Sequence, residues 1–391
     1  MPYLLLVLFL AAWVGHACIW TSILNYVYAR PYPKAILKPW RHFTGLVILG
    51  FPWLAFLILN PQELGNPVEP PADPFNGVTG RVVLVYCTIG LVIGAVVFPA
   101  ITVMRLRRKP PAIVLSETTH TLDLWAELGR EAIGNGRGKL AARLPFNSIY
   151  RVDFTELTLA IPSLPPEWDG LTILHLTDVH YHGTPSRSFH ERVLAEIEKR
   201  WPSPDLVCLT GDFVDTDDHH TWIGPLLGRL RGSHGNFAIL GNHDLIHQTE
   251  TIRTSLTEAG YTVLGNGWQQ TTIRGVPCTM IGHEGPWFAP PTDLTATPGE
   301  GFRFCLSHTP DNFYWGQEHR VGLMLCGHVH GGQIRLPVIG SIFVPSMYGR
   351  RFDMGVFEGK GTAMVVNRGL SGKEPLRFRC NAQVVRITLK K

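Results

Sequence analysis

The chain has 391 residues, enough for more than one domain, and 45% of them are hydrophobic while only 17% are charged, a high apolar share for a soluble protein. The formal net charge of +4 lies largely beside apolar stretches, which favours anionic lipid over nucleic acid as the attracted partner. The seven cysteines include no CxxC pair, which argues against a disulfide framework and against a thiolate zinc or redox site.

Three apolar stretches precede residue 110, at 4–28, 43–59 and 82–104. About 17–25 apolar residues in a helix match the hydrocarbon thickness of a bilayer. No Lys or Arg precedes Arg30, so the first stretch lacks the basic start of a signal peptide and indicates an uncleaved anchor. The second stretch is the shortest and contains Pro52, so a re-entrant or tilted segment is its alternative interpretation. We therefore expect an N-terminal helical membrane anchor with about three transmembrane helices.

Loop charge predicts the orientation of this anchor. The loop after the first stretch is basic, the second loop (60–80) is acidic, and the third stretch is followed by RLRRK at 105–109. Because an excess of Lys and Arg stays on the cytoplasmic side, we expect a multi-pass protein of the cell membrane with a cytoplasmic C-terminal domain. The charged residues are Arg30, Lys34, Lys38 and Arg41 in the first loop, and Glu63, Glu69 and Asp73 in the second.

The chain is predicted to consist of an anchor at 1–109, a juxtamembrane linker at 110–150 and a catalytic domain at 151–391. In the linker, residues 121–133 have helical apolar spacing, which fits either an interfacial helix or a helix packed on the following domain. The run GNGRGK that follows fails the P-loop pattern, since Leu140 stands where Ser or Thr should be, and is predicted to be a flexible loop.

From about residue 150, short runs of Val, Ile, Leu and Phe alternate with helical patterns. This alternation is typical of a sheet covered by helices, and it predicts an α/β fold. Residues 187–201 and 249–260 are predicted to be helices between strands, the second of them ended by Gly260.

Five apolar, strand-like runs each stop at a residue that can bind a metal ion. In sheets of this kind, ligands gather outside the carboxyl ends of the strands, so these side chains are expected to form one set. The runs end in Asp178 and His180, in Asp212 with Asp215 beyond it, in Asn242, His243 and Asp244, in His308, and in His328 and His330.

The chemistry of this set indicates a pair of cations and a phosphate ester. Imidazole, carboxylate and amide oxygen suit zinc, manganese or iron better than calcium. A carboxylate that bridges two cations holds them about 3.5–4 Å apart, the geometry used to activate water and clamp a phosphoryl group. Since Asp178 and Asp212 are the only carboxylates expected to bind, the pair of divalent cations keeps positive charge, which favours a phosphate ester over a neutral ester or amide.

The motifs DxH (178–180), GDxxD (211–215), GNHD (241–244), SHxP (307–310) and GHxH (327–330) occur in this order. With them the chain resembles the calcineurin-like metallophosphoesterases, over roughly 150–391. The sequence GGQIRLP after the last motif resembles one membrane-associated bacterial branch of that family. The resemblance implies a four-layer α-β-β-α sandwich, two packed sheets flanked by helices, which follows the anchor.

The resemblance also implies a role for each matching position. One divalent metal ion would be held by Asp178, His180, Asp212 and His330, and Asp212 would bridge to a second ion held by Asn242, His308 and His328. A bridging hydroxide would attack phosphorus in line. His243 would protonate the leaving oxygen, with Asp244 as its orienting partner; such proton transfer is typically worth about 10²–10⁴-fold in rate.

The expected function is therefore a membrane-anchored, metal-dependent hydrolysis of a phosphodiester or pyrophosphate bond. A lipid-linked substrate is one option, because the basic juxtamembrane run places the domain near lipid headgroups, and a non-catalytic metal-dependent scaffold is the rival interpretation. Nucleic acid is a poor candidate, since no basic run is interleaved with aromatic residues. Asp215 either orients a ligand or caps a turn, and His283 and Glu284 are candidates for the substrate pocket. Metal identity and oligomeric state are left open.

Overall fold

The computed structural model describes residues 2–59, 78–299 and 301–391. The chain divides into two compact units, Met1–Lys109 and Pro110–Lys391, which we call the helical unit and the sandwich unit. The acidic residues predicted to mark the second loop, Glu63, Glu69 and Asp73, lie outside the described residues.

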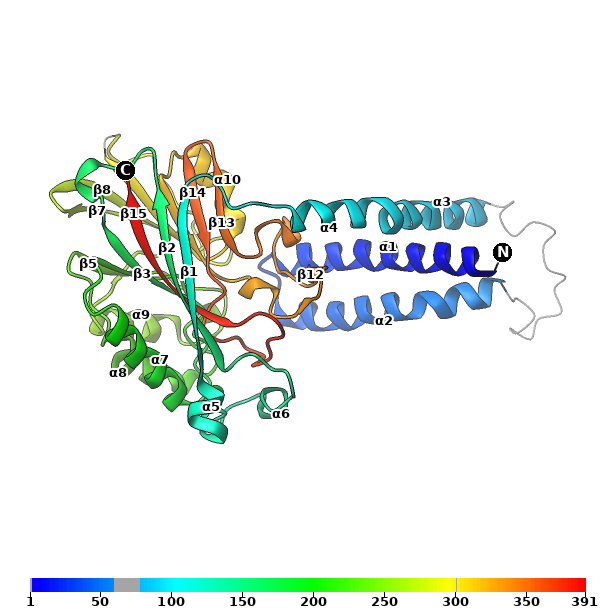
Figure 1. Cartoon of the computed structure of the whole chain (residues 1–391), viewed down its shortest axis with the longest axis horizontal. Coiled ribbons are helices and arrows are strands. Elements are labelled where there is room, and N and C mark those ends of the chain that lie inside the picture. Colours follow the sequence, from blue (N-terminus) through cyan, green and yellow to red (C-terminus); the bar gives the residue numbers. More distant parts are fainter. Residues whose placement is uncertain (1, 60–77, 300) are drawn as a thin grey trace. The chain divides into compact units, whose positions relative to one another are not determined.

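The helical unit confirms that all three apolar stretches are helical (Figure 1). Among the described residues, two helices are long and apolar enough to cross a membrane, Tyr3–Tyr28 and Gly80–Leu106. The helix that contains the second apolar stretch and Pro52 is not one of these two. The elements are α1 (Pro2–Tyr28), α2 (Lys34–Leu59), α3 (Val78–Val92), a π-helical turn (Ile93–Val97) and α4 (Phe98–Leu106).

Small and polar residues make several of the contacts between these helices. A Cβ atom on Gly94 would lie 1.8 Å from the carbonyl oxygen of Ala11, so only glycine permits this approach of the two backbones. His16 Nδ1 lies 2.6 Å from Tyr86 Oη, and Trp20 Nε1 donates a hydrogen bond to the same oxygen. Close backbone approach and polar contacts of this kind are how helices associate where apolar side chains gain little by burial.

The described strands of the sandwich unit form two large sheets and a small one. Sheet 1 has the order β1-β2-β15-β3-β4-β5-β6, and sheet 2 has the order β13-β14-β10-β9-β8-β7. Sheet 1 contains β1 (Val114–Asp123), β2 (Arg151–Ala160), β3 (Thr172–Leu176), β4 (Leu206–Leu209), β5 (Gly235–Ala238), β6 (Thr262–Val263) and β15 (Ala382–Lys390). Sheet 2 contains β7 (Trp268–Ile273), β8 (Val276–His283), β9 (Phe302–Ser307), β10 (Leu323–Cys326), β13 (Gly355–Gly359) and β14 (Thr362–Val366), and the small sheet contains β11 (Arg335–Leu336) and β12 (Gly340–Ser341).

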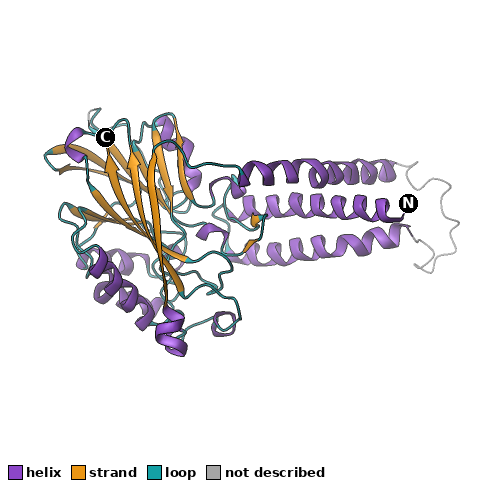
Figure 2. Cartoon of the chain, viewed as in Figure 1, coloured by secondary structure: helices purple, strands orange, loops and turns teal. Residues whose placement is uncertain are grey.

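The two large sheets pack face to face, and helices cover their outer faces (Figure 2). Ile173 and Leu206 of sheet 1 meet Met280 and Phe304 of sheet 2 in the core between the sheets. Helices α7 (Arg187–Arg200), α8 (Ile223–Leu227) and α9 (Thr249–Glu258) share a core with sheet 1, and α10 (Phe313–Glu318) shares one with sheet 2. This confirms the predicted α/β architecture of two packed sheets flanked by helices, and α7 and α9 confirm the two predicted helices.

Strand register brings the predicted ligand positions to one edge. β3, β4 and β5 are parallel, with Leu176 opposite Leu209 and Leu209 opposite Ala238. In sheet 2, β9 and β10 are also parallel, with Ser307 opposite Cys326. The loops that follow these strands therefore leave the sheets at the same level, as the sequence pattern predicts.

Residues 110–150 are not the linker that the sequence predicts. β1 pairs along its length with β2 in antiparallel register, so this segment is the edge strand of sheet 1. The helix that follows, α5 (Leu124–Leu128), is capped by Asp123, which accepts hydrogen bonds from the Trp125 and Ala126 amides. Leu124 and Ile133 are buried in the core beneath α7, so the helical part of the segment packs on the domain. A second short helix, α6 (Lys139–Ala142), follows.

Candidate metal centre

The ends of the strands bring the predicted ligands into two groups that share one residue. Within each group the ligand atoms all lie within 4.8 Å of one another, and Asp212 belongs to both. His308 Nε2 lies 3.1 Å from Asn242 Oδ1, which adds the amide oxygen to the second group. The first group is Asp178, His180, Asp212 and His330, and the second is Asp212, His308 and His328.

Most of these residues have strained backbone conformations. Five of them have positive φ angles, between 45° and 68°. Non-glycine residues rarely occupy this left-handed region, and such conformations cost about 1–3 kcal/mol each and cluster at functional sites. The fold therefore holds these side chains in directions that relaxed strand ends would not give. The five are Asp178, His180, Asp212, His328 and His330.

Two glycines of the motifs leave room for the ligands. A Cβ atom on Gly241 would lie 2.2 Å from Asp212 Oδ1 and 2.5 Å from His308 Cε1. A Cβ atom on Gly327 would lie 2.0 Å from Thr177 Oγ1 and 2.3 Å from Asp178 Oδ2. Any side chain at either position would displace a ligand.

The hydrogen bonds of the histidines fit a metal site. Three rings each use one nitrogen to reach a fixed acceptor: His180 Nδ1 lies 2.9 Å from Asp215 Oδ2, and His308 Nδ1 lies 2.7 Å from the Thr210 carbonyl oxygen. His328 Nε2 lies 3.1 Å from the carbonyl oxygen of Pro345. If each of these nitrogens carries the proton, the opposite nitrogen keeps its lone pair, as metal-ligating histidines do.

His328 gives the sharpest sign of a missing partner. Its Nδ1 atom is buried and has no hydrogen-bond partner among the described residues. A buried polar atom without a partner costs free energy comparable to a lost hydrogen bond. Because His328 belongs to the second ligand group, a cation bound there by Nδ1 would satisfy this atom.

Buried carboxylates and histidines lie side by side in the site, and each shifts the pKa of the other. Burial alone would raise the pKa of Asp212, but His308 and His243 beside it hold that pKa well below its usual range. Burial alone would lower the pKa of His308, but the carboxylates of Asp212 and Asp178 raise it to about 9. By contrast, burial and the neighbouring His308 lower the pKa of His328 to about 3. In the absence of cations, protonated histidines therefore carry the positive charge that the buried carboxylates need.

Asp215 is the orienting partner of His243, a role that the sequence analysis assigned to Asp244. One carboxylate oxygen of Asp215 contacts His243 Nδ1, and the other contacts His180 Nδ1. Asp244 instead accepts hydrogen bonds from the backbone amides of Gly241, Asp212, Phe213 and Val214, at 2.8–3.2 Å. Asp244 thus ties two ligand loops together, and of the two roles considered for Asp215 the contacts match orientation.

His283 and Glu284 both have partners outside the ligand groups. His283 is buried, packs edge-on against Trp315 and contacts Asn312. Glu284 is buried in an ion pair with Arg253 and accepts a hydrogen bond from the Leu240 amide. The Glu284 contact braces the loop that carries Asn242 and His243, and the contacts of both residues lie within the protein.

The sequence analysis did not identify Trp287, which lies in the loop that contains Glu284. Its ring centroid lies 4.6 Å from that of His328 and 5.5 Å from that of His308, and the side chain is only partly buried. Trp287 therefore covers the second ligand group with an apolar surface. The available signal was its place in GHEGPWF, directly after the strand that ends in His283.

The C-terminal loop also supports the site. The Ser371 amide donates a hydrogen bond to the carbonyl oxygen of Asp178. The fully buried Arg377 guanidinium donates to the carbonyl oxygens of Ser371 and Arg368, at 2.6 and 2.7 Å. Arg377 thus fixes the loop against the Asp178 backbone, a role that no motif in the sequence indicates.

Comparison with known proteins agrees with this geometry. Residues 171–332 match the family model for calcineurin-like phosphoesterases. Over 283 residues the chain is 32% identical to the uncharacterized metallophosphoesterase YkuE of Bacillus subtilis, an alignment that covers 68% of this chain and 95% of that protein. The chain belongs to the calcineurin-like phosphoesterase family. As a member of the family, it is a metal-dependent hydrolase of phosphate esters.

Two further relatives match the chain over a little more than half of its length. The chain is 31% identical to the phosphodiesterase YaeI of Escherichia coli, over 56% of this chain and 81% of that protein. It is 22% identical to a transmembrane protein with a metallophosphoesterase domain from Danio rerio, over 60% of this chain and 56% of that protein. Calcineurin-like domains thus occur among its relatives in a protein described as transmembrane.

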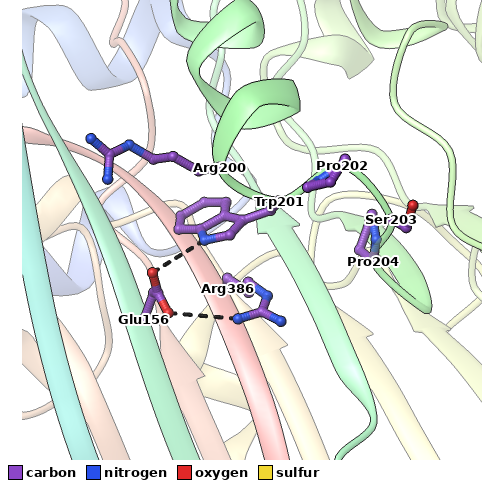
Figure 3. Close-up of a pocket in the computed structure, with 7 residues that line it drawn as sticks. All are labelled: Glu156, Arg200, Trp201, Pro202, Ser203, Pro204 and Arg386. Atoms are coloured by element: carbon purple, nitrogen blue, oxygen red, sulfur yellow. Dashed lines mark hydrogen bonds and ion pairs between the residues drawn. The ribbon is translucent and has the colours of Figure 1, made fainter.

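A separate pocket of about 230 Å³ lies beside the end of α7 (Figure 3). Both arginines that line it have acidic partners: Arg386 pairs with Glu156 at 3.6 Å, and Arg200 pairs with Glu196 at 2.6 Å. Trp201 Nε1 donates a hydrogen bond to Glu156. No predicted ligand lines this pocket, and its charges are already balanced, so we assign it no chemistry.

Proposed function

We propose that the chain is a membrane-anchored, dinuclear phosphoesterase that hydrolyses a phosphodiester or pyrophosphate bond. The observation that carries the proposal is the pair of ligand groups that share Asp212. A shared carboxylate between two compact sets of N and O ligands suits a pair of manganese, zinc or iron ions.

The two cations would be held by the side chains that the sequence and the structure both bring together. When bound, they supply activation of water and neutralisation of the charge on the phosphoryl group. The first ion would take Asp178, His180, Asp212 and His330, and the second would take Asp212, Asn242, His308 and His328.

His243 is the proton donor of this proposal. Its side chain is partly exposed, and its amide donates to Asp212 Oδ1 at 2.8 Å. Since Nδ1 contacts Asp215, the ring can present a protonated Nε2 to the oxygen of a leaving group. Asp215 holds the ring in this orientation.

The membrane part of the proposal rests on the helical unit. Two of its helices are long and apolar enough to cross a membrane, and the basic run at 105–109 follows the second. We propose a multi-pass anchor with the sandwich unit in the cytoplasm. An enzyme held there meets lipid headgroups at high effective concentration, which supports a lipid-linked phosphate ester as substrate.

The test uses the full chain purified in detergent, with hydrolysis of a chromogenic phosphodiester measured with and without manganese. We expect metal-dependent turnover, and Asp212→Asn should reduce it by at least about 10³-fold, because a metal ion contributes several kcal/mol to transition-state stabilisation. Asp218→Asn makes the same chemical change at an exposed position and should leave the rate unchanged.

The alternatives give different results. Metal binding without cleavage of any diester, monoester or pyrophosphate would favour a scaffold over an enzyme. Equal rates on soluble and lipid-linked diesters in reconstituted membranes would contradict the lipid-linked substrate while leaving the hydrolase in place. A reporter fused after Lys391 that is active only outside the cell would overturn the cytoplasmic orientation.

A further inference from the structure

Two surface segments of the sandwich unit expose large apolar side chains. In residues 137–146, Leu140 and Phe146 are each 82% exposed, and in residues 334–351 Val338 is 68% exposed. We call these two segments together the apolar-basic face. Its other exposed apolar side chains are Leu144, Ile334, Leu336, Ile342 and Met347.

The two segments adjoin one another through residues 374–378. Asn147 Nδ2 donates to the Pro375 carbonyl oxygen at 2.8 Å, on the side of the first segment. On the other side, Gln333 Nε2 donates to the Glu374 carbonyl oxygen at 3.2 Å, and the Phe378 amide donates to the Gln333 carbonyl oxygen. In Figure 1, α6 and β12 accordingly lie at the same end of the sandwich unit, away from β5 and β7.

The face is basic as well as apolar. Neither segment contains Asp or Glu, and the exposed carboxylate between them belongs to Glu374. The basic residues are Arg137, Lys139 and Arg143 in the first segment, and Arg335, Arg350 and Arg351 in the second. Apolar side chains among Lys and Arg are the composition of surfaces that bind anionic lipid.

In the β11–β12 hairpin of this face, polar side chains face the protein and an apolar side chain faces outward. Arg335 Nη1 and Ser341 Oγ both donate to the buried Asp353, at 2.8 and 2.6 Å. Arg350 Nη1 donates to the Ile339 carbonyl oxygen at the tip. The polar groups of the hairpin thus face the protein while Val338 faces outward, the reverse of an ordinary surface turn.

Both segments hold an apolar residue in a conformation that disfavours it. Val338 has a φ angle of +67° and Phe146 one of +66°. A β-branched residue in the left-handed region is a genuine outlier, and strain of this kind persists where function requires it. Glycine or asparagine would relieve the strain at either tip, so the conformation points to a use for the exposed apolar groups.

The hairpin is anchored directly to the metal centre. The ligand His330 lies four residues before Ile334, and the ligand His328 contacts the Pro345 carbonyl oxygen at the other end of the segment. The segment that carries the apolar tip is therefore joined at both ends to residues of the metal centre.

We propose that the apolar-basic face docks on an anionic lipid bilayer. The inference rests on the membrane attachment proposed above, since only residues 107–113 separate α4 from β1 and three of these, Arg107, Arg108 and Lys109, are basic. Docking would bury Phe146 and Val338 among acyl chains and headgroups, with the exposed Arg137 and Arg143 at the phosphates. It would present the metal centre to phosphate esters at the lipid surface.

The test measures solvent access of single positions in the full chain. Val338→Cys and Phe146→Cys are reconstituted in nanodiscs of equal parts phosphatidylcholine and phosphatidylglycerol, and in nanodiscs of phosphatidylcholine alone. An uncharged water-soluble maleimide is added, and modification at each site is followed by peptide mass spectrometry. Gln269→Cys, at an exposed position on β7, is the control.

In anionic discs we expect modification at positions 338 and 146 to slow by roughly tenfold relative to position 269, because burial of such side chains is worth at least a factor of ten in an equilibrium constant. High salt should weaken this protection, since it screens the arginines. Equal rates at the three positions would overturn the proposal, as would protection that rises with protein concentration instead of lipid charge, which would indicate a second copy.

A second variant guards against a local change of structure at the tip. Arg137→Glu with Arg143→Glu reverses two exposed charges and should abolish most of the protection of Val338→Cys, while the unfolding temperature stays the same. Unchanged protection would overturn the proposal. None of these measurements needs catalysis, so they fail or succeed independently of the hydrolase; a chain that does not enter nanodiscs would overturn the membrane attachment and the docking together.

Discussion

The two units use apolar side chains in opposite ways. In the helical unit, Leu46 and Val96 are exposed, while the buried contacts involve Gly94 and the pair His16 and Tyr86. In the sandwich unit, apolar residues fill the cores between the sheets and beneath the helices, where they are hidden from solvent. The difference teaches that a hydrophobic share of 45% has no single meaning, because the surrounding solvent decides which side chains must be hidden.

The apolar-basic face breaks this rule inside the sandwich unit. There, Phe146 and Val338 are exposed as they would be in the helical unit, and the buried Asp353 holds the hairpin that carries Val338. Because this patch exposes apolar side chains as the helical unit does, we expect it to contact lipid as well. The comparison thus connects the docking proposal with the anchor.

The largest expected effect lies in the sandwich unit alone. His243→Ala should lower kcat for an alkyl phosphodiester by about 10²–10⁴-fold, because the leaving oxygen loses its proton donor. Hydrolysis by the full chain in detergent measures this. His234→Ala, at a histidine outside the ligand groups, is the matched control.

The nature of the leaving group sharpens this result. A nitrophenolate leaves without a proton, so the loss from His243→Ala should shrink with a nitrophenyl ester. An equal loss with both substrates would argue that His243 serves the structure and not proton transfer.

A glycine-to-alanine change in each unit tests whether hydrolysis depends on the sandwich unit alone. Gly241→Ala would push a Cβ atom into Asp212 and His308 and should cost about 10²-fold or more in activity, because small displacements of catalytic groups have effects of that size. Gly94→Ala would separate α1 from the helix that packs on it and should leave hydrolysis of a soluble diester unchanged. Activity assays and the thermal stability of reconstituted chain measure the two effects.

Both glycine changes have controls. No heavy atom lies within 4 Å of a Cβ built on Gly224 or on Gly45, so Gly224→Ala and Gly45→Ala should be silent in the respective units. If Gly94→Ala abolished hydrolysis of the soluble substrate, the chemistry would depend on the helical unit and the comparison would fail.

The sequence was sufficient to predict that the proposed ligands gather at the ends of the strands, and to predict the sheets that carry them. Buried parallel strands produce continuous apolar runs, and a polar residue after each run is conspicuous, as at Asp212 and His308. Helix α7 was equally predictable, because Ser186 caps it and its apolar face recurs with helical period.

Other parts had no such signal. β1 is an edge strand with mostly exposed, polar residues, so no alternation marks it and its segment was predicted to be a linker. Asp215 and Asp244 lie in adjacent loops, and only the folded positions show which of them reaches His243. The exposed tip at Val338 contains an ordinary apolar run, which sequence patterns assign to a core.

Asp215→Asn should have a smaller effect than the loss of His243. Because Asp215 contacts both His180 and His243, the change should lower metal affinity or kcat by about 10–100-fold, the usual cost of removing a group that supports a ligand. Calorimetric titration with manganese and steady-state kinetics separate the two contributions. An effect on folding alone, with normal metal affinity and kcat in the folded fraction, would contradict the assignment.

The smallest predicted effect is the release of protons from buried histidines of the sandwich unit when a metal ion binds. Near pH 7, in the absence of cations, His308 is protonated, since its carboxylate neighbours outweigh burial and raise its pKa to about 9; the same balance raises the pKa of His180. A metal ion needs the lone pairs of these rings, so binding must release protons. Burial lowers the pKa of His330 to about 3, so His330 is neutral already and releases none.

Manganese affinity should therefore rise as the pH increases from about 6.5 toward 9, by about tenfold per pH unit for each proton released. Titration calorimetry in two buffers of different ionisation enthalpy counts these protons directly. We expect up to two, from His180 and His308, and His308→Gln should remove one. If the heat did not depend on the buffer, the histidines would be neutral before the metal arrives, and the buried carboxylates would need another source of positive charge.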